Sequence, residues 1–81
     1  FRPNPTNGNG SFTYYLPAAS RVTIRLIDMM GKVQQEFSKD QLPGSYQMSL
    51  DLSKLPGGIY IYTLETEGNN SQILSNRIIK Y

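Results

Sequence analysis

Apolar and polar residues alternate along most of this chain. In residues 21–28, Val22, Ile24 and Leu26 occupy every second position, with polar residues between them. A period of two puts neighbouring side chains on opposite faces of a β-strand, so one face packs in a core while the other meets water. No segment shows a sustained helical period. The pattern predicts strands at residues 11–16, 21–28, 32–37, 46–52, 59–67 and 71–81.

Turn-forming residues separate these predicted strands. Gly31 is expected to take a positive φ in the first hairpin. Leu-Pro-Gly sequences at Pro43 and Pro56 predict type II turns, and residues 68–70 close a last hairpin. Strands that recur about every ten residues between such turns predict an antiparallel β-sandwich of about seven strands. A small barrel is the alternative fold.

The inner faces of the predicted strands carry most of the large apolar residues. Val33 and Phe37 are expected to join this core, and Tyr62 is expected to reach a polar partner near its rim. The other inward-facing residues are Phe12, Tyr14, Leu16, Val22, Ile24, Leu26, Tyr46, Met48, Leu50, Leu52, Tyr60 and Leu64.

Residues 59–67 carry apolar side chains on both faces. If Tyr60, Tyr62 and Leu64 face the core, Ile59 and Ile61 face outward. Either a loop covers these two isoleucines, or they form an exposed apolar patch together with Ile79 or Tyr81.

Composition narrows the possible functions. The chain has 81 residues, enough for one domain, and contains neither Cys nor His. It therefore lacks thiol chemistry, the commonest general base and the commonest metal ligand. A net charge of +2 is too small for the basic surface of a nucleic-acid-binding protein. No apolar run is long enough for a transmembrane segment. No signal peptide opens the chain, which reads as part of a longer polypeptide.

Polar residues offer little for catalysis or metal binding. No serine lies on a nucleophile elbow, and no glycine-rich phosphate loop follows a strand. Asp28 and Asp40 are expected to accept hydrogen bonds from turn amides, and together with Asp51 they do not form the dense acidic loop of a calcium site. We predict no enzymatic activity, no cofactor and no bound metal.

Five sequence features occur in a characteristic order along nearly the whole chain. They are an opening Pro-Asn-Pro followed by Gly, a Leu-Pro turn, a strand ending in Asp–x–x–Gly–Lys, a Leu-Pro-x-Gly-Ile-Tyr element, and a basic, apolar last strand. In this order they resemble the C-terminal sorting domain, type A, of the bacterial type IX secretion system. One difference from the family is that Tyr81 follows Lys80, whereas many relatives end on Lys. The motif residues are Pro3, Asn4, Pro5, Gly8, Asp28, Gly31, Lys32, Pro56, Gly58 and Tyr60.

The resemblance implies a single immunoglobulin-like sandwich over residues 1–81, at the end of a larger secreted protein. Its partners would be the cargo domains of the same chain, the outer-membrane translocon and a sortase-like peptidase. The cargo would reach the cell surface or the medium through the periplasm and the outer membrane. In many relatives the domain is removed and the cargo attached to a surface lipopolysaccharide. The residues expected to carry translocon recognition are Arg77, Ile78, Ile79, Lys80 and Tyr81.

Other interpretations remain open on the sequence. Arg77 and Lys80 also suit the solvated edge of a strand. Pro3-Asn4-Pro5 also suits a stiff entry into the first strand, and we interpret it as structural. The chain could instead be a spacer, or a carbohydrate-binding module with exposed tyrosine rings. The tyrosines are Tyr14, Tyr15, Tyr46, Tyr60, Tyr62 and Tyr81.

Overall fold

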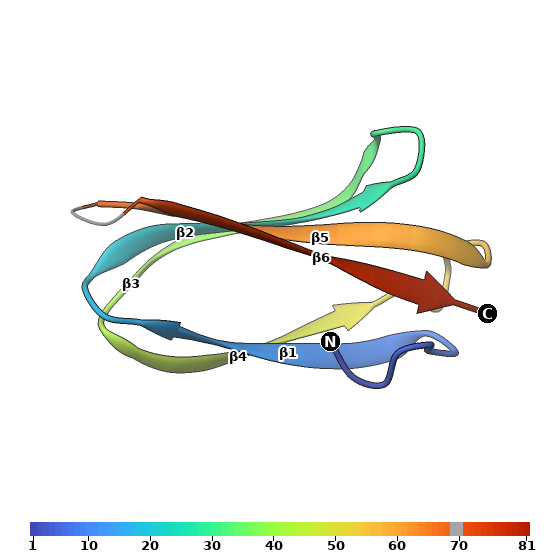
Figure 1. The fold of residues 1–81 in the computed structure, drawn as a ribbon, viewed down its shortest axis with the longest axis horizontal. Coiled ribbons are helices and arrows are strands. Elements are labelled where there is room, and N and C mark those ends of the chain that lie inside the picture. The colour runs from blue at the N-terminus through green and yellow to red at the C-terminus, as the bar shows by residue number, and fades with distance from the viewer. Residues whose placement is uncertain (69–70) are drawn as a thin grey trace.

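Two antiparallel sheets face each other in this domain (Figure 1). The computed structural model describes residues 1–68 and 71–81. The smaller sheet pairs β1 with β4, and the larger has the order β3-β2-β5-β6. The strands are β1 (Asn9–Leu16), β2 (Ser20–Asp28), β3 (Val33–Gln41), β4 (Gly44–Asp51), β5 (Gly58–Glu67) and β6 (Gln72–Lys80).

The predicted antiparallel sandwich is confirmed, with one difference in strand number. The described residues contain six strands, where the spacing of turns predicted about seven. The turn predicted at Asn69 and Asn70 lies outside the described residues. The consecutive strands β2 and β3 pair within the larger sheet, as do β5 and β6, and the other three connections cross between the sheets. The Pro43-Gly44 turn sequence lies on one of these crossings, where Gly44 has a φ of +145°.

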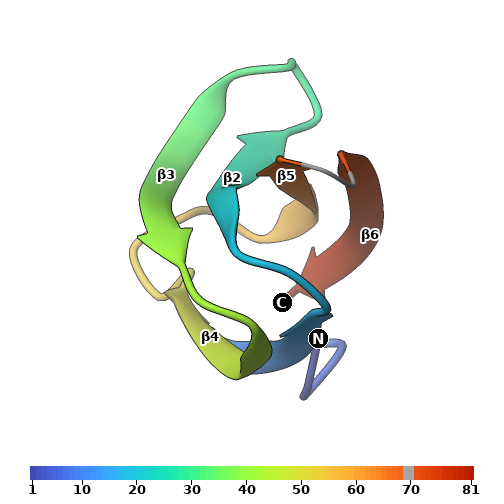
Figure 2. The same ribbon diagram turned by 90° about the vertical axis from the view of Figure 1, so that its left-hand side faces the viewer.

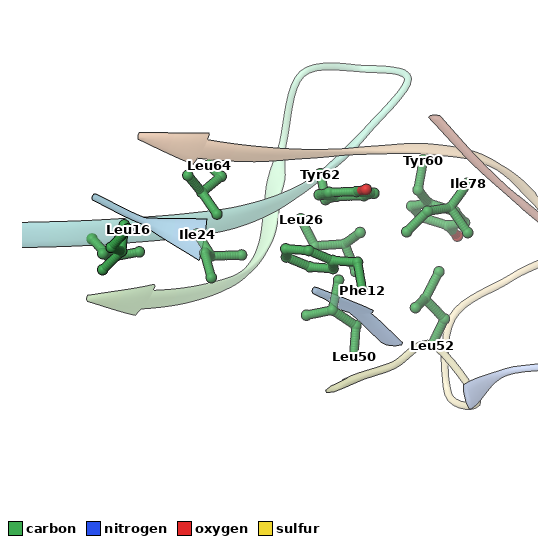
Figure 3. Packing of buried hydrophobic residues seen from close by; sticks show 11 residues of the cluster. Phe12, Leu16, Ile24, Leu26, Leu50, Leu52, Tyr60, Tyr62, Leu64 and Ile78 are labelled. Atoms are coloured by element: carbon green, nitrogen blue, oxygen red, sulfur yellow. The ribbon is translucent and has the colours of Figure 1, made fainter. Parts of the chain in front are cut away.

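The core lies between the two sheets, as the alternation predicted (Figure 3). Phe12 of β1 stacks on Tyr62 of β5 with ring centres 4.3 Å apart. Tyr14, Tyr46 and Met48 are half-buried and pack against this cluster. The buried residues are Phe12, Leu16, Val22, Ile24, Leu26, Leu50, Leu52, Tyr60, Tyr62, Leu64 and Ile78.

Val33 does not join the core, although Phe37 packs against it. The β2–β3 pairing is irregular at the end of β2, where Leu26 lies opposite Gln35 but Ile27 lies opposite Val33. Ile27 follows the inward-facing Leu26 and therefore points outward, and Val33 shares its face. The prediction for Val33 was wrong because a strand pattern does not reveal a shift in register.

The polar partner expected for Tyr62 belongs instead to Tyr60. The Tyr60 hydroxyl donates a 2.6 Å hydrogen bond to the carbonyl of Pro56. Both rings are buried, but Tyr60 lies near the beginning of β5, beside the turn that precedes it. Tyr60 therefore reaches a backbone carbonyl, while Tyr62, two residues further on, stacks on another ring.

Candidate functional site

The second half of β6 is paired along both of its edges. β5 lies on one side, where Ile59 pairs with Ile79. On the other side the N-terminal segment Asn4–Thr6 runs alongside β6, with a parallel bridge between Thr6 and Lys80. Figure 2 shows the N-terminal segment beside the end of β6, although 75 positions separate Asn4 from Ile79. Residues from the two ends of the chain therefore form one structural unit.

Asn4 binds β6 in the manner of a neighbouring strand. Its side-chain Oδ1 accepts a hydrogen bond of 2.9 Å from the amide of Ile79, and its Nδ2 donates one of 2.9 Å to the carbonyl of Arg77. Pro3 and Pro5 have no N–H and cannot donate to a sheet. A carboxamide carries both a donor and an acceptor, so Asn4 supplies with its side chain what its proline neighbours cannot supply from the backbone.

Thr6 continues this pairing through its backbone. Its amide donates to the carbonyl of Ile79 at 2.9 Å, and its carbonyl accepts from the amide of Tyr81 at 3.0 Å. The Thr6 side chain is buried, and its hydroxyl donates to the carbonyl of Asn9 while accepting from the amide of Gly8. These bonds close a tight turn that leads into β1. Pro-Asn-Pro is thus more than the stiff entry that we predicted, because it covers the edge of the last strand.

The five residues predicted for translocon recognition have different surroundings. Ile78 is fully buried. Lys80 is half-buried, and its Nζ donates a 2.7 Å hydrogen bond to the carbonyl of Leu55. Arg77, Ile79 and Tyr81 are exposed, with Ile79 at 37% and Tyr81 at 72%. In the folded domain, only these last three side chains are freely presented to a large partner.

Ile79 belongs to an apolar patch on the outer face of the larger sheet. We define the isoleucine patch as Ile27, Ile59, Ile61 and Ile79. Ile59 pairs with Ile79, and Ile61 lies between Ile27 and Arg77 on the neighbouring strands. Ile59 and Ile61 are 38% and 36% exposed, so the second of our two expectations for them, an exposed patch with Ile79, is the correct one. The sequence pattern predicted that Ile59 and Ile61 face outward, but it did not predict which residues lie beside them on the adjacent strands.

The motif around Asp28 builds the β2–β3 turn. Asp28 Oδ1 accepts hydrogen bonds of 2.9 Å from the amides of Met30 and Lys32, and Oδ2 accepts one from the side chain of Gln34. These bonds, chiefly the one from the Lys32 amide, lower the pKa of Asp28 because they stabilise the ionised carboxylate. Gly31 has a φ of +84°, as predicted. This motif organises a turn and leaves the Lys32 side chain exposed.

The turn role predicted for Asp40 was wrong, whereas Asp51 does accept a hydrogen bond from a turn amide. Asp51 accepts the amide of Ser53 at 2.8 Å, and the hydrogen bonds from Ser53 lower its pKa. Asp40, predicted to accept a turn amide, instead pairs with Arg21 across β2 and β3 at 3.3 Å. Asp40 lies inside a strand, whose backbone amides bond to the neighbouring strand rather than to a side chain.

The Leu-Pro-x-Gly-Ile-Tyr element holds the end of β6. Tyr60 bonds to Pro56, and Lys80 bonds to Leu55, so both contacts reach the same turn. Gly57 lies directly against the chain end, where an added Cβ would be 2.7 Å from the carbonyl carbon of Tyr81. The turn and the last strand fit together only because residue 57 has no side chain.

The described residues contain neither a cluster of metal-ligating side chains nor a membrane-spanning helix. They contain no group of three or more acidic side chains that could hold a metal ion. No helix in the described part of the chain is long and apolar enough to cross a membrane. Among the tyrosines, Tyr60 and Tyr62 are buried, Tyr14 stacks on Tyr46, and the exposed Tyr15 lies on β1 while the exposed Tyr81 follows β6. The described residues thus show no row of exposed tyrosine rings that could bind a sugar chain.

Comparison with known proteins identifies the family. The sequence model described as "Secretion system C-terminal sorting domain" matches residues 2–80, nearly the whole chain. No curated protein and no solved structure gives a significant match. The matched range contains both the Pro-Asn-Pro segment and the strand β6 that it covers. The chain therefore belongs to the C-terminal sorting domains of type IX secretion, which mark proteins for the cell surface or the extracellular space across the outer membrane.

Proposed function

We propose that residues 1–81 form one sorting domain at the end of a larger secreted protein, and that the outer-membrane translocon recognises the domain in its folded form. Recognition uses the outward side chains of Arg77, Ile79 and Tyr81, together with the isoleucine patch beside them. The supporting observation is the alternation along β6. Ile78 and Lys80 are held by the domain itself, whereas their neighbours point to solvent.

The covered edge of β6 favours side-chain recognition over strand addition. A partner strand would need the backbone groups of Arg77, Ile79 and Tyr81, but Asn4 and Thr6 already bond to them. An exposed apolar surface next to a cation is a common basis for protein association. Arg77 lies opposite Ile61 and adds this positive charge at the border of the patch. The translocon surface is expected to be apolar, with an acidic residue near its rim.

An export assay with point variants tests this proposal. Residues 1–81 are fused behind a signal peptide and a fluorescent reporter in a host with a type IX system. Arg77→Gln combined with Ile79→Thr is expected to leave the reporter in the periplasm. Ile73→Thr is the matched control, because Ile73 is also an exposed isoleucine of β6 but lies outside the isoleucine patch. Deleting residues 77–81 is less informative, since it removes buried Ile78 and unfolding alone could block export.

Two results would contradict the proposal. One is normal export of the Arg77→Gln, Ile79→Thr protein. The other is equal loss of export in the Ile73→Thr control when thermal melting shows that all variants are folded. Failure of the unaltered domain to export the reporter would direct attention to the spacer and carbohydrate-binding alternatives, for which a pull-down with insoluble glycans is the next experiment.

We also propose that a sortase-like peptidase removes the domain and attaches the cargo to the cell surface. The mass of the exported reporter tests this step. A reporter that has lost residues 1–81 and remains bound to cells is expected, whereas a full-length reporter in the medium would exclude cleavage.

A further inference from the structure

The sandwich is open along one side, between β1 and β6. Three hollows line this side, and they join because neighbouring ones share residues. Together they form a groove that runs from Phe1 to Ala18 along the free edge of β1. Beyond its Phe1 end its walls are mostly apolar, with Phe12, Tyr14, Leu64 and Leu74 among them. Figure 2 shows β1 and β6 bordering this open side when the sandwich is seen end-on.

The inner face of β6 is covered at one end only. Ile78 points inward and is fully buried, at the level where the N-terminal segment covers the edge. Leu74 also points inward, since it pairs with the buried Leu64, yet it is 58% exposed. An inward-facing leucine that remains open to solvent indicates that too few side chains of the opposite sheet pack against it. That sheet has only two strands.

Phe1 and Arg2 already lie where the C-terminal end of a third strand would pair with β1 in the smaller sheet. Arg2 and Ser11 form an antiparallel bridge in which each amide donates to the other residue's carbonyl, at 2.8 and 2.9 Å. The Phe1 ring enters the groove and lies 6.1 Å from the ring of Tyr62. Gly10 leaves room for it, because a Cβ there would lie 2.2 Å from the ring.

We propose that the polypeptide joining a cargo to Phe1 continues along this groove and completes the sandwich as a third strand beside β1. This inference rests on the proposed function, in which cargo is attached on the amino side of the domain. The occupant is an extended segment, antiparallel to β1, with apolar side chains at alternate positions. The cargo junction is then part of the folded domain rather than a free linker.

The bridge at Arg2 fixes the register of the added strand. Edge-facing amides recur at every second residue, so after Ser11 the next ones on this edge are those of Thr13 and Tyr15. The second and fourth residues before Phe1 would lie opposite Tyr14 and Leu16, whose side chains face inward or line the groove. These two positions require apolar side chains, while the first and third face outward and tolerate polar ones.

Two extended chains of identical composition provide the test. One carries Val-Thr-Val-Thr directly before Phe1, which places both valines in the groove. The control carries Thr-Val-Thr-Val, which turns both valines outward. The first extension is expected to raise the melting temperature of the domain by about 4 °C or more relative to the control. It is also expected to slow hydrogen exchange of the Thr13 and Tyr15 amides by about tenfold or more.

Leu74→Ser supplies a second comparison. Leu74 is largely exposed, so the substitution should leave the unextended chain folded with nearly unchanged stability. In the Val-Thr-Val-Thr chain it should remove part of the gain in melting temperature. Equal melting temperatures for the two extensions, or slowed exchange at Ile73 and Ser75 of β6 instead of at β1, would overturn the inference. Neither result depends on export, so the inference and the proposed function can fail separately.

Discussion

The amide of Ile79 donates a 2.9 Å hydrogen bond to the side chain of Asn4, 75 positions earlier in the chain. The same carboxamide donates to the carbonyl of Arg77. One side chain therefore covers part of the outer edge of the strand that we predicted to carry translocon recognition. Exposed strand edges invite pairing with other chains, so this cover also protects a secreted domain from edge-to-edge association.

Asn4→Ala should destabilise the domain by about 1–2 kcal/mol, because it removes both hydrogen bonds at a solvent-exposed edge. Asn4→Asp should destabilise it also, since a carboxylate oxygen would replace the donor that faces the Arg77 carbonyl. Asn7→Ala is the control, at an exposed asparagine in the same segment. Urea denaturation and hydrogen exchange at Ile79 measure the effect. Unchanged exchange at Ile79 in Asn4→Ala would show that the edge is protected by something other than Asn4.

Gly57→Ala and Gly58→Val should both destabilise the domain, but for different reasons. A Cβ on residue 57 would be 2.7 Å from backbone carbon of Tyr81, so the end of β6 must move, at a cost of about 1–3 kcal/mol. A Cβ on residue 58 meets nothing within 4 Å, and its cost, about 1 kcal/mol, comes from a φ of +157°. Thermal melting measures both, and amide shifts at Tyr81 should change only in Gly57→Ala. An unchanged melting temperature in Gly58→Val would show that the turn tolerates a side chain.

The turn at Asp28 should make stability depend on pH in acid. Its folded-state pKa lies below the ordinary value of 3.8, so the unfolded chain binds its proton first as the pH falls. The stabilisation is therefore complete above pH 3.8, and is lost as the pH falls through the folded-state pKa. In Asp28→Asn the loss of stability between neutral pH and pH 2 should be smaller than in the unaltered domain. Asp51 also has a lowered pKa, so the variant should retain part of the dependence. Identical pH profiles from urea denaturation would exclude the role of Asp28.

Substitutions at Lys80 and Arg77 should have different effects, the first on the stability of the domain and the second on export. Lys80→Met removes the hydrogen bond to Leu55 and should destabilise the domain by about 1 kcal/mol. Arg77→Met should leave stability nearly unchanged, because the Arg77 side chain is exposed, and should reduce export. Thermal melting and the reporter assay measure the two effects. A destabilised Arg77→Met with normal export would reverse these assignments.

Much of the fold is readable from local pattern. The alternation of apolar and polar residues correctly predicted the inward-facing side chains of β1, β2, β4 and β5. It does so because every second side chain must be apolar when one face of a strand is buried. Gly31 was predictable from the need for positive φ in a tight hairpin. The exposure of Val33 was not predictable, because the register shift opposite Ile27 depends on how the partner strand pairs.

The candidate site also has some features that the sequence predicted and others that it could not predict. The order of motifs was sufficient to indicate the family, and the alternation of residues 59–67 was sufficient to predict that Ile59 and Ile61 face away from the core. Which of the last five residues is accessible was not predictable. The burial of Ile78 and the bond from Lys80 to Leu55 involve residues that come much earlier in the chain.

The sequence by itself determined which segments become strands, which faces are apolar and which family the chain belongs to, because each strand pattern and each family motif consists of residues close together in the chain. The tertiary structure alone decided that Asn4 covers β6, that Lys80 and Ile78 are held by the domain, and that residues of β1, β5 and β6 line one groove. Each of these contacts joins residues from distant parts of the chain. Local periodicity carries no information about them, since only packing of the whole chain brings the partners together.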